Sequence, residues 1–146
     1  MKKLLFIAML LMLGVSTFAQ GRVGVITVTG TDSVLTTSTI YRGFTLTQGT
    51  GTAKMSMQVI VTKIGATAIS GTLYIQGSND GTNYFNVNSA YVAVADTTTQ
   101  NATIADAATQ SFTFTQKNLL YRYYRVKCTG IGSGSWRPAV YGSIYY

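Results

Sequence analysis

The feature that most constrains this chain is a two-residue alternation of apolar and polar side chains along most of its length. In QSFTFTQ (110–116), Phe112 and Phe114 alternate with hydroxyl residues, and in KMSMQVIVTKI (54–64) Met55 and Met57 begin a similar apolar row. Strict alternation over about four to eight residues is typical of a strand with one face buried. The same pattern recurs over residues 23–30, 38–47, 71–78, 83–95, 121–129 and 139–146.

Turn-forming residues separate these segments at intervals of about 8–16 residues, a spacing that favours a sandwich or jelly roll. The sequence therefore predicts an all-β protein, a single antiparallel β-sandwich of the jelly-roll kind. Between the expected strands, residues 95–110 are low in hydrophobicity and are expected to form a long loop. The only proline, Pro138, is expected just before the last strand.

The N-terminus has the pattern of an export signal. Lys2 and Lys3 precede an apolar run from residue 4 to 15, and small residues lead to Ala19. This pattern predicts a signal peptide over residues 1–19 and one β-sandwich domain over 20–146. The alternative is a retained hydrophobic helix. The run is about 12 residues long, shorter than the roughly 20 needed to cross a bilayer, so no stable transmembrane span is expected.

Composition narrows the class of protein. Charged residues make up 10% of the chain, with 11 bases against four acids, whereas about 25% is typical of globular domains. Such a surface, polar through hydroxyls and amides, suits an exported or particle-bound protein. The bases are spread along the sequence, and nucleic-acid binding would require a basic cluster. We therefore expect no nucleic-acid partner.

The chain lacks the residues that enzymes most often use for catalysis. The chain contains no His and no Glu, which removes the commonest general base and metal ligand. The four aspartates, at 32, 80, 96 and 106, fall in separate turn-like segments, so a catalytic carboxylate pair would require distant segments to converge. The glycine-rich run GIGSGS (130–135) is too weak a pattern to indicate a phosphate loop. We expect no enzyme activity, no catalytic residue, no cofactor and no metal.

The segment QGSNDGTNYFNV (76–87) predicts a β-hairpin. Asn79, Asp80 and Gly81 tolerate the left-handed backbone of a reversal, and neighbouring hydroxyls can bond the local backbone. The alternative is a calcium site, for which one carboxylate and two amides are a poor set of ligands.

The single cysteine, Cys128, excludes an intrachain disulfide. It is in step with Tyr124 and Val126, which favours a small buried hydrophobic role. The alternative is an intermolecular disulfide.

Aromatic residues near the C-terminus form the candidate interaction surface. Ten tyrosines are present, and Tyr and Arg favour interfaces because they combine large contact area with a polar tip. The alternative for the same residues is cross-strand packing, with Trp136 as a packing plug and not a sugar platform. The candidate residues are Tyr121, Tyr123, Arg125, Trp136, Tyr145 and Tyr146.

Two motifs carry a resemblance over about 70 residues. The first is SNDG with Tyr84 (78–84), and the second is RYYRV (122–126). Together they resemble the C-terminal half of discoidin-like (coagulation-factor type C) jelly rolls, and they are similar to β-sandwich modules of phage virion proteins. The chain lacks the Trp after the hairpin and the flanking cysteines of the discoidin pattern. The resemblance implies a jelly-roll fold and, on the discoidin side, glycan binding; it implies no catalytic residue.

Two functions follow as hypotheses. The first is a non-catalytic structural subunit of a phage virion or extracellular assembly, which contacts copies of itself or neighbouring assembly proteins. The alternative is a secreted carbohydrate-binding, discoidin-like module. Either function places the protein outside the cytoplasm, in the periplasm, the extracellular space or at a virion surface.

Overall fold

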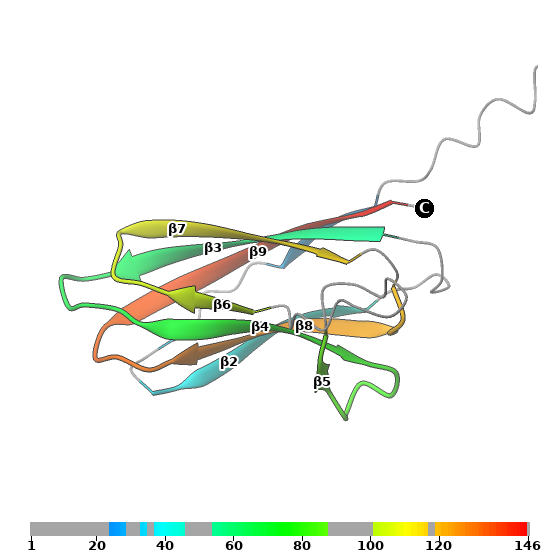
Figure 1. Cartoon of the computed structure of the whole chain (residues 1–146), viewed down its shortest axis with the longest axis horizontal. Helices are drawn as coiled ribbons and strands as arrows, with labels where there is room; N and C mark the ends of the chain where they lie inside the picture. The colour runs from blue at the N-terminus through cyan, green and yellow to red at the C-terminus, as the bar shows by residue number, and fades with distance from the viewer. Residues whose placement is uncertain are drawn as a thin grey trace, which may run out of the picture.

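A computed structural model describes residues 24–28, 33–34, 37–45, 54–87, 101–116 and 119–145. The predicted signal segment (1–19) lies outside these residues. Every regular element in the described part of the chain is a strand (Figure 1). The strands are β1 (Gly24–Val28), β2 (Thr39–Thr45), β3 (Lys54–Ile64), β4 (Gly71–Ser78), β5 (Phe85–Asn86), β6 (Asn101–Ile104), β7 (Thr109–Gln116), β8 (Tyr123–Gly130) and β9 (Ser135–Tyr145). Within this part of the chain, no helix is long and apolar enough to cross a membrane.

The strands form two antiparallel sheets that lie one above the other in Figure 1. Sheet A has the order β1-β9-β3-β7, and sheet B has the order β2-β8-β4-β5, with β6 also paired to β4. From β1 to β4, and again from β6 to β9, consecutive strands belong to alternate sheets. This crossing pattern is that of a double-sheet jelly roll. The predicted all-β sandwich is confirmed.

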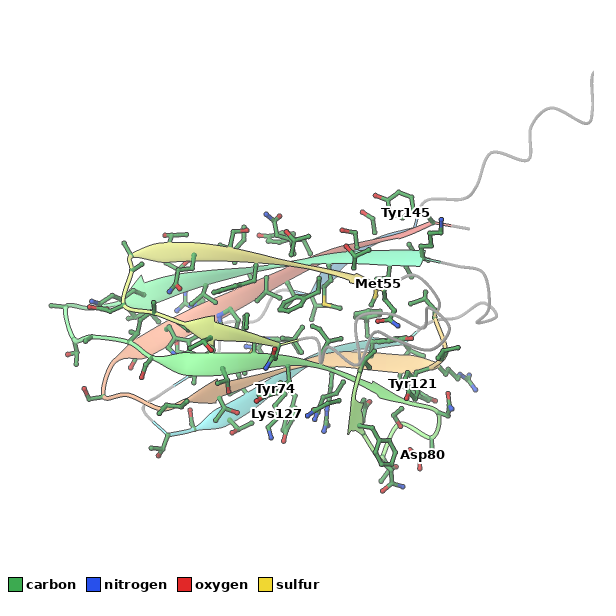
Figure 2. The ribbon with its side chains drawn as sticks, in the orientation of Figure 1. Met55, Tyr74, Asp80, Tyr121, Lys127 and Tyr145 are labelled. Atoms are coloured by element: carbon green, nitrogen blue, oxygen red, sulfur yellow. The ribbon has the colours of Figure 1, made fainter. Side chains whose placement is uncertain are left out.

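The core fills the space between the sheets because alternate side chains of each strand point inward. On β3, Met55, Met57, Val59 and Val61 are buried, as the alternation predicts. Figure 2 shows Met55 between the sheets and Tyr145 on the outer side of sheet A. Trp136 and Tyr124 are the largest fully buried side chains. Burying such aromatic rings contributes strongly to stability without any disulfide.

Two inward-facing glycines of β4 make room for aromatic rings. A Cβ at Gly71 would lie 3.0 Å from the Trp136 ring, and one at Gly77 would lie 2.3 Å from the Tyr121 ring. Tyr121 packs against the core and meets Tyr124 edge to face, with 5.9 Å between ring centroids. The two glycines therefore fix where both rings sit against sheet B.

Two boundary predictions are wrong. The expected loop 95–110 contains β6 and the first residues of β7. Pro138 lies inside β9, opposite Val61 of β3. Trp136 exchanges backbone hydrogen bonds with Val34 on the other side of β9, so the missing N–H of Pro138, two residues on, also faces away from β3. The proline therefore removes no hydrogen bond of the β3–β9 ladder.

Cys128 lies in the core, as its alternation with Tyr124 and Val126 predicts. Burial raises the pKa of its thiol to about 12. A thiol that is fully buried and protonated is not placed to form an intermolecular disulfide, so the structure disfavours that alternative.

Candidate functional site

The outer face of sheet B carries aligned rows of aromatic, basic and amide side chains. Cross-strand register places Lys127 of β8 between Tyr41 of β2 and Tyr74 of β4. The next row places Arg125 beside Gln76, which in turn is opposite Asn86 of β5. Figure 2 shows Tyr74 and Lys127 on this outer side, with Asp80 on the hairpin that projects past it. We call this set, together with Tyr84 and Tyr123, the sheet B face.

Arg125 is the most constrained side chain of the sheet B face. Its guanidinium lies between two rings, 4.0 Å from the centroid of Tyr41 and 3.7 Å from that of Tyr84. Its Nε donates to Oε1 of Gln76 at 2.8 Å, and Nε2 of Gln76 donates to Oδ1 of Asn86 at 3.0 Å. Cation–π contacts and charged hydrogen bonds favour this one orientation. The arginine is thus held in place before any partner binds.

The hairpin between β4 and β5 supplies one of these two rings. Asp80 Oδ1 accepts hydrogen bonds from the backbone N–H groups of Thr82 and Asn83, both at 2.8 Å. The Ser78 hydroxyl also donates to Oδ1, and the Asn83 amide donates to Oδ2 at 2.7 Å. The backbone bonds from Asn83 and Thr82 are the main reason that the pKa of Asp80 is well below its usual range. Gly81 has a φ of 74°, the left-handed conformation that the sequence predicts.

The hairpin prediction is confirmed, since β4 and β5 pair antiparallel. Asp80 serves as an internal acceptor whose oxygens already bind four donors of their own loop. A calcium ion would have to displace those donors. Among the described residues, no group of three or more Cys or Asp side chains could hold a metal ion.

The two motifs that carry the family resemblance contact each other in the structure. The backbone N–H of Arg122 donates to Oδ1 of Asn79 at 3.3 Å. A Cβ on Gly81 would lie in ordinary contact with the Tyr123 ring, 3.4 Å away. Together with the stack of Tyr84 on Arg125, these contacts join the hairpin to β8. The sheet B face therefore combines segments more than 35 residues apart in sequence.

The predicted site residues separate into different places. Tyr123 and Arg125 lie on the sheet B face. Tyr121, which the sequence places in the candidate interaction surface, turns inward against the core and does not lie on the sheet B face. Trp136 is fully buried and is a packing residue, not part of any surface. Tyr145 is 46% exposed but lies on sheet A, and Tyr146 falls outside the described residues.

Sequence reasoning missed Tyr41, Tyr74, Tyr84 and Gln76. Each follows the hairpin or has the outward parity of its own expected strand. Only the pairing of the strands brings Tyr41, Gln76 and Tyr84 to Arg125, and Tyr74 to Lys127. That register depends on pairing between distant strands, which alternation within one segment does not specify.

The charge and chemistry of the sheet B face suit binding. It carries Arg125 and Lys127, with Arg122 beside it over the ring of Tyr123. The nearby carboxylate, Asp80, is engaged within its own loop. Asp106 lies elsewhere, between β6 and β7, and its hydrogen bond from Lys63, at 2.7 Å, is the main reason that its pKa is lowered. The face therefore presents positive charge, aromatic rings and amides to a partner.

No family model matches the sequence, and no curated protein matches it. Among solved structures, a structure of infectious bursal disease virus Gx strain matches 88% of this chain at 13% identity, with a TM-score of 0.49. Dimeric latent PorU from Porphyromonas gingivalis matches 89% of this chain at 11% identity, with a TM-score of 0.40. This chain spans 32% of the first matched chain and 13% of the second. Likeness at this level carries no inference about function.

Proposed function

We propose that this protein is a non-catalytic structural subunit of an assembly at a virion surface or outside the cell, and that it docks a neighbouring subunit through the sheet B face. The observation that carries the proposal is the arginine held between Tyr41 and Tyr84. A side chain already fixed in place loses little conformational entropy on binding. Tyr and Arg also dominate the residues that contribute most to known interfaces.

The charge of the face indicates what the neighbour presents. Arg122, Arg125 and Lys127 lie on or beside it, and the overall charge of the chain is +7. Two such faces would repel each other. The surface that docks here is therefore rich in carboxylates or backbone carbonyls. The sheet B face of one subunit then contacts a different surface of the next subunit, as in a growing assembly.

The proposal is tested on the purified protein by light scattering and electron microscopy over a wide range of concentration. We expect particles larger than a dimer. Tyr41→Ala and Arg125→Met should abolish these particles because each removes part of the stack. Tyr141→Ala is the matched control, since Tyr141 is 40% exposed on the opposite sheet and Tyr41 is 46% exposed. Particles no larger than a dimer at the highest soluble concentration would contradict the assembly role.

A secreted carbohydrate-binding module is the second candidate. The exposed ring of Tyr41 lies beside the planar polar groups of Arg125, Gln76 and Asn86, an arrangement in which a sugar ring could stack and accept hydrogen bonds. A glycan array distinguishes this candidate from the first. Hits that disappear with Tyr41→Ala and persist with Tyr141→Ala would favour glycan binding, and an array without hits would exclude it for the glycans present.

A further inference from the structure

Three loops meet at the end of the sandwich where β3, β6 and β8 finish (Figure 1). They join β3 to β4, β6 to β7 and β8 to β9. Ile131 N donates to the Ser70 carbonyl at 3.1 Å, and Ile69 N donates to Oδ1 of Asp106 at the same distance of 3.1 Å. These two hydrogen bonds tie the three loops together. We call residues 65–70, 105–108 and 131–134 the loop end.

The loop end presents one charge among small side chains. Its exposed residues include GATA (65–68) and ADAA (105–108). Asp106 is the only charged residue in the three loops, and 48% of its side chain is exposed. Lys63, at the end of β3, has a side chain that is only 16% exposed. Because alanine and glycine surround the carboxylate, another surface can approach it closely.

Asp106 is held through one of its two carboxylate oxygens. Oδ1 accepts hydrogen bonds from Nζ of Lys63 at 2.7 Å and from the backbone N–H of Ile69 at 3.1 Å. These bonds, that from Lys63 first, lower the pKa of Asp106 and keep the carboxylate charged at neutral pH. Oδ2 has no hydrogen-bond donor among the described residues. The side chain therefore has a fixed orientation and a free acceptor.

Arg125 of the sheet B face has the matching donors. Its Nε is bonded to Gln76, whereas the two terminal NH2 groups of the guanidinium have no hydrogen-bond acceptor among the described residues. Since the guanidinium lies between the rings of Tyr41 and Tyr84, a carboxylate reaches it only at its edge. There a carboxylate can accept paired, charge-assisted hydrogen bonds. A short acidic side chain between small neighbours, as in ADAA, fits this approach between two rings.

We propose that Asp106 of the loop end docks onto Arg125 in the sheet B face of a second copy of this chain. The inference rests on the proposed function and deepens it, because it names the surface that the neighbouring subunit offers. Charge complementarity favours this occupant, since Arg122 and Lys127 make the face basic as well. Of the two aspartates in the described part of the chain, Asp80 binds donors of its own loop through both oxygens. Asp106 is therefore the described carboxylate that another copy can offer.

This contact joins two different surfaces of the chain. The loop end lies at one end of the sandwich, and the sheet B face lies on its side (Figures 1 and 2). Two copies joined in this way still have one free loop end and one free face, so the contact repeats into a ring or a filament. A copy that has lost one of the two surfaces can still bind once, through the other.

Sedimentation velocity of two variants, alone and mixed, tests the proposal. Asp106→Asn keeps the acceptor at Oδ1 but replaces Oδ2 with an NH2 group, which cannot accept from Arg125. Arg125→Met removes the donors. Each change should weaken association by about tenfold or more, so each variant alone should be a monomer where the parent chain forms particles. An equal mixture should form a dimer and nothing larger, because the intact face of Asp106→Asn binds the intact loop end of Arg125→Met.

A matched pair of lysine variants tests the contact without changing the bonds of Asp106. Ala107→Lys adds a positive charge next to Asp106 in the exposed loop and should prevent particles, because the charge faces Arg125 of the next copy. Thr113→Lys adds the same charge to an exposed position of sheet A and should leave the particles as in the parent chain.

The outcomes separate this inference from the proposed function. Particles that Tyr41→Ala abolishes and Asp106→Asn does not would overturn docking through Asp106 but leave the role of the sheet B face intact. A mixture of Asp106→Asn and Arg125→Met without a dimer, or equal effects of Ala107→Lys and Thr113→Lys, would also overturn the inference. A parent chain that forms no particles would contradict both.

Discussion

Substitution of Gly77 tests the packing of the aromatic rings on sheet B. A Cβ at residue 77 would lie 2.3 Å from Cδ2 and 2.5 Å from Cγ of Tyr121. These atoms are at the base of the ring, so a small rotation of the side chain cannot relieve the overlap. Overpacking of this kind typically costs about 1–3 kcal/mol. Alanine also lowers the conformational entropy of the unfolded chain, which offsets roughly 0.4–1 kcal/mol of this cost. We expect Gly77→Ala to lower the free energy of unfolding by about 1–2 kcal/mol.

Gly43 is the matched control in the same sheet. A Cβ there meets nothing closer than 3.4 Å, so Gly43→Ala should change stability by less than about 0.5 kcal/mol or increase it slightly. A double-mutant cycle isolates the ring: Tyr121→Ala should cost at least about 1 kcal/mol less in the Gly77→Ala background than in the parent chain.

Denaturant unfolding followed by fluorescence measures these values directly, because Trp136 is the only tryptophan and is fully buried. The packing argument is refuted if Gly77→Ala unfolds at the same denaturant concentration as Gly43→Ala. Additive effects of Gly77→Ala and Tyr121→Ala would refute it equally.

Three other predictions concern single residues. Burial raises the pKa of the Cys128 thiol from 9.0 to about 12, so the thiol of the unfolded chain ionises at lower pH than that of the folded chain. The free energy of unfolding should therefore fall as pH rises from about 9 to about 12, and Cys128→Ala should remove this part of the pH dependence. The thiol should also resist alkylation in the native protein. Asp80→Ala should loosen the hairpin and release Tyr84 from Arg125, which faster proteolysis between β4 and β5 would reveal. The pKa of Asp80 lies below its ordinary 3.8. The hydrogen bonds that the Asp80 carboxylate accepts should therefore hold the hairpin of the parent chain at neutral pH and be lost only in strong acid. Trp136→Phe should lower the thermal midpoint but leave binding by the folded protein unchanged, because Trp136 is part of the core and not of the sheet B face; altered binding by fully folded Trp136→Phe would contradict that assignment.

Alternation predicted most of the fold because one buried face produces the same two-residue period wherever the strand pairs. It failed at β6, where the four residues NATI contribute only Ala102 and Ile104 to the core. It also failed at Pro138, since the rule that proline avoids inner strands gives way where the missing N–H faces away from the β3–β9 ladder. Both failures depend on neighbours that a single segment does not reveal.

The candidate site was predicted only in part for the same reason. Tyr123 and Arg125 share one face, as the alternation predicts, because both lie within β8. Tyr121 was misplaced because β8 begins at Tyr123, so the two-residue parity does not extend back to it. The rings that hold Arg125 come from β2 and from the hairpin after β4, and their meeting is fixed by register and by the hydrogen bonds of Asp80. Such a site becomes visible only once the strands are paired.

Hydroxyl-radical footprinting of the purified protein, dilute and assembled, tests the central claim most directly. Tyr41 on the sheet B face and Tyr141 on sheet A are 46% and 40% exposed, so both should be oxidised at similar rates in the dilute protein. In the assembled protein we expect oxidation of Tyr41 to fall severalfold while that of Tyr141 stays the same. Equal oxidation of Tyr41 in the two states, or protection of Tyr141 alone, would contradict docking through the sheet B face.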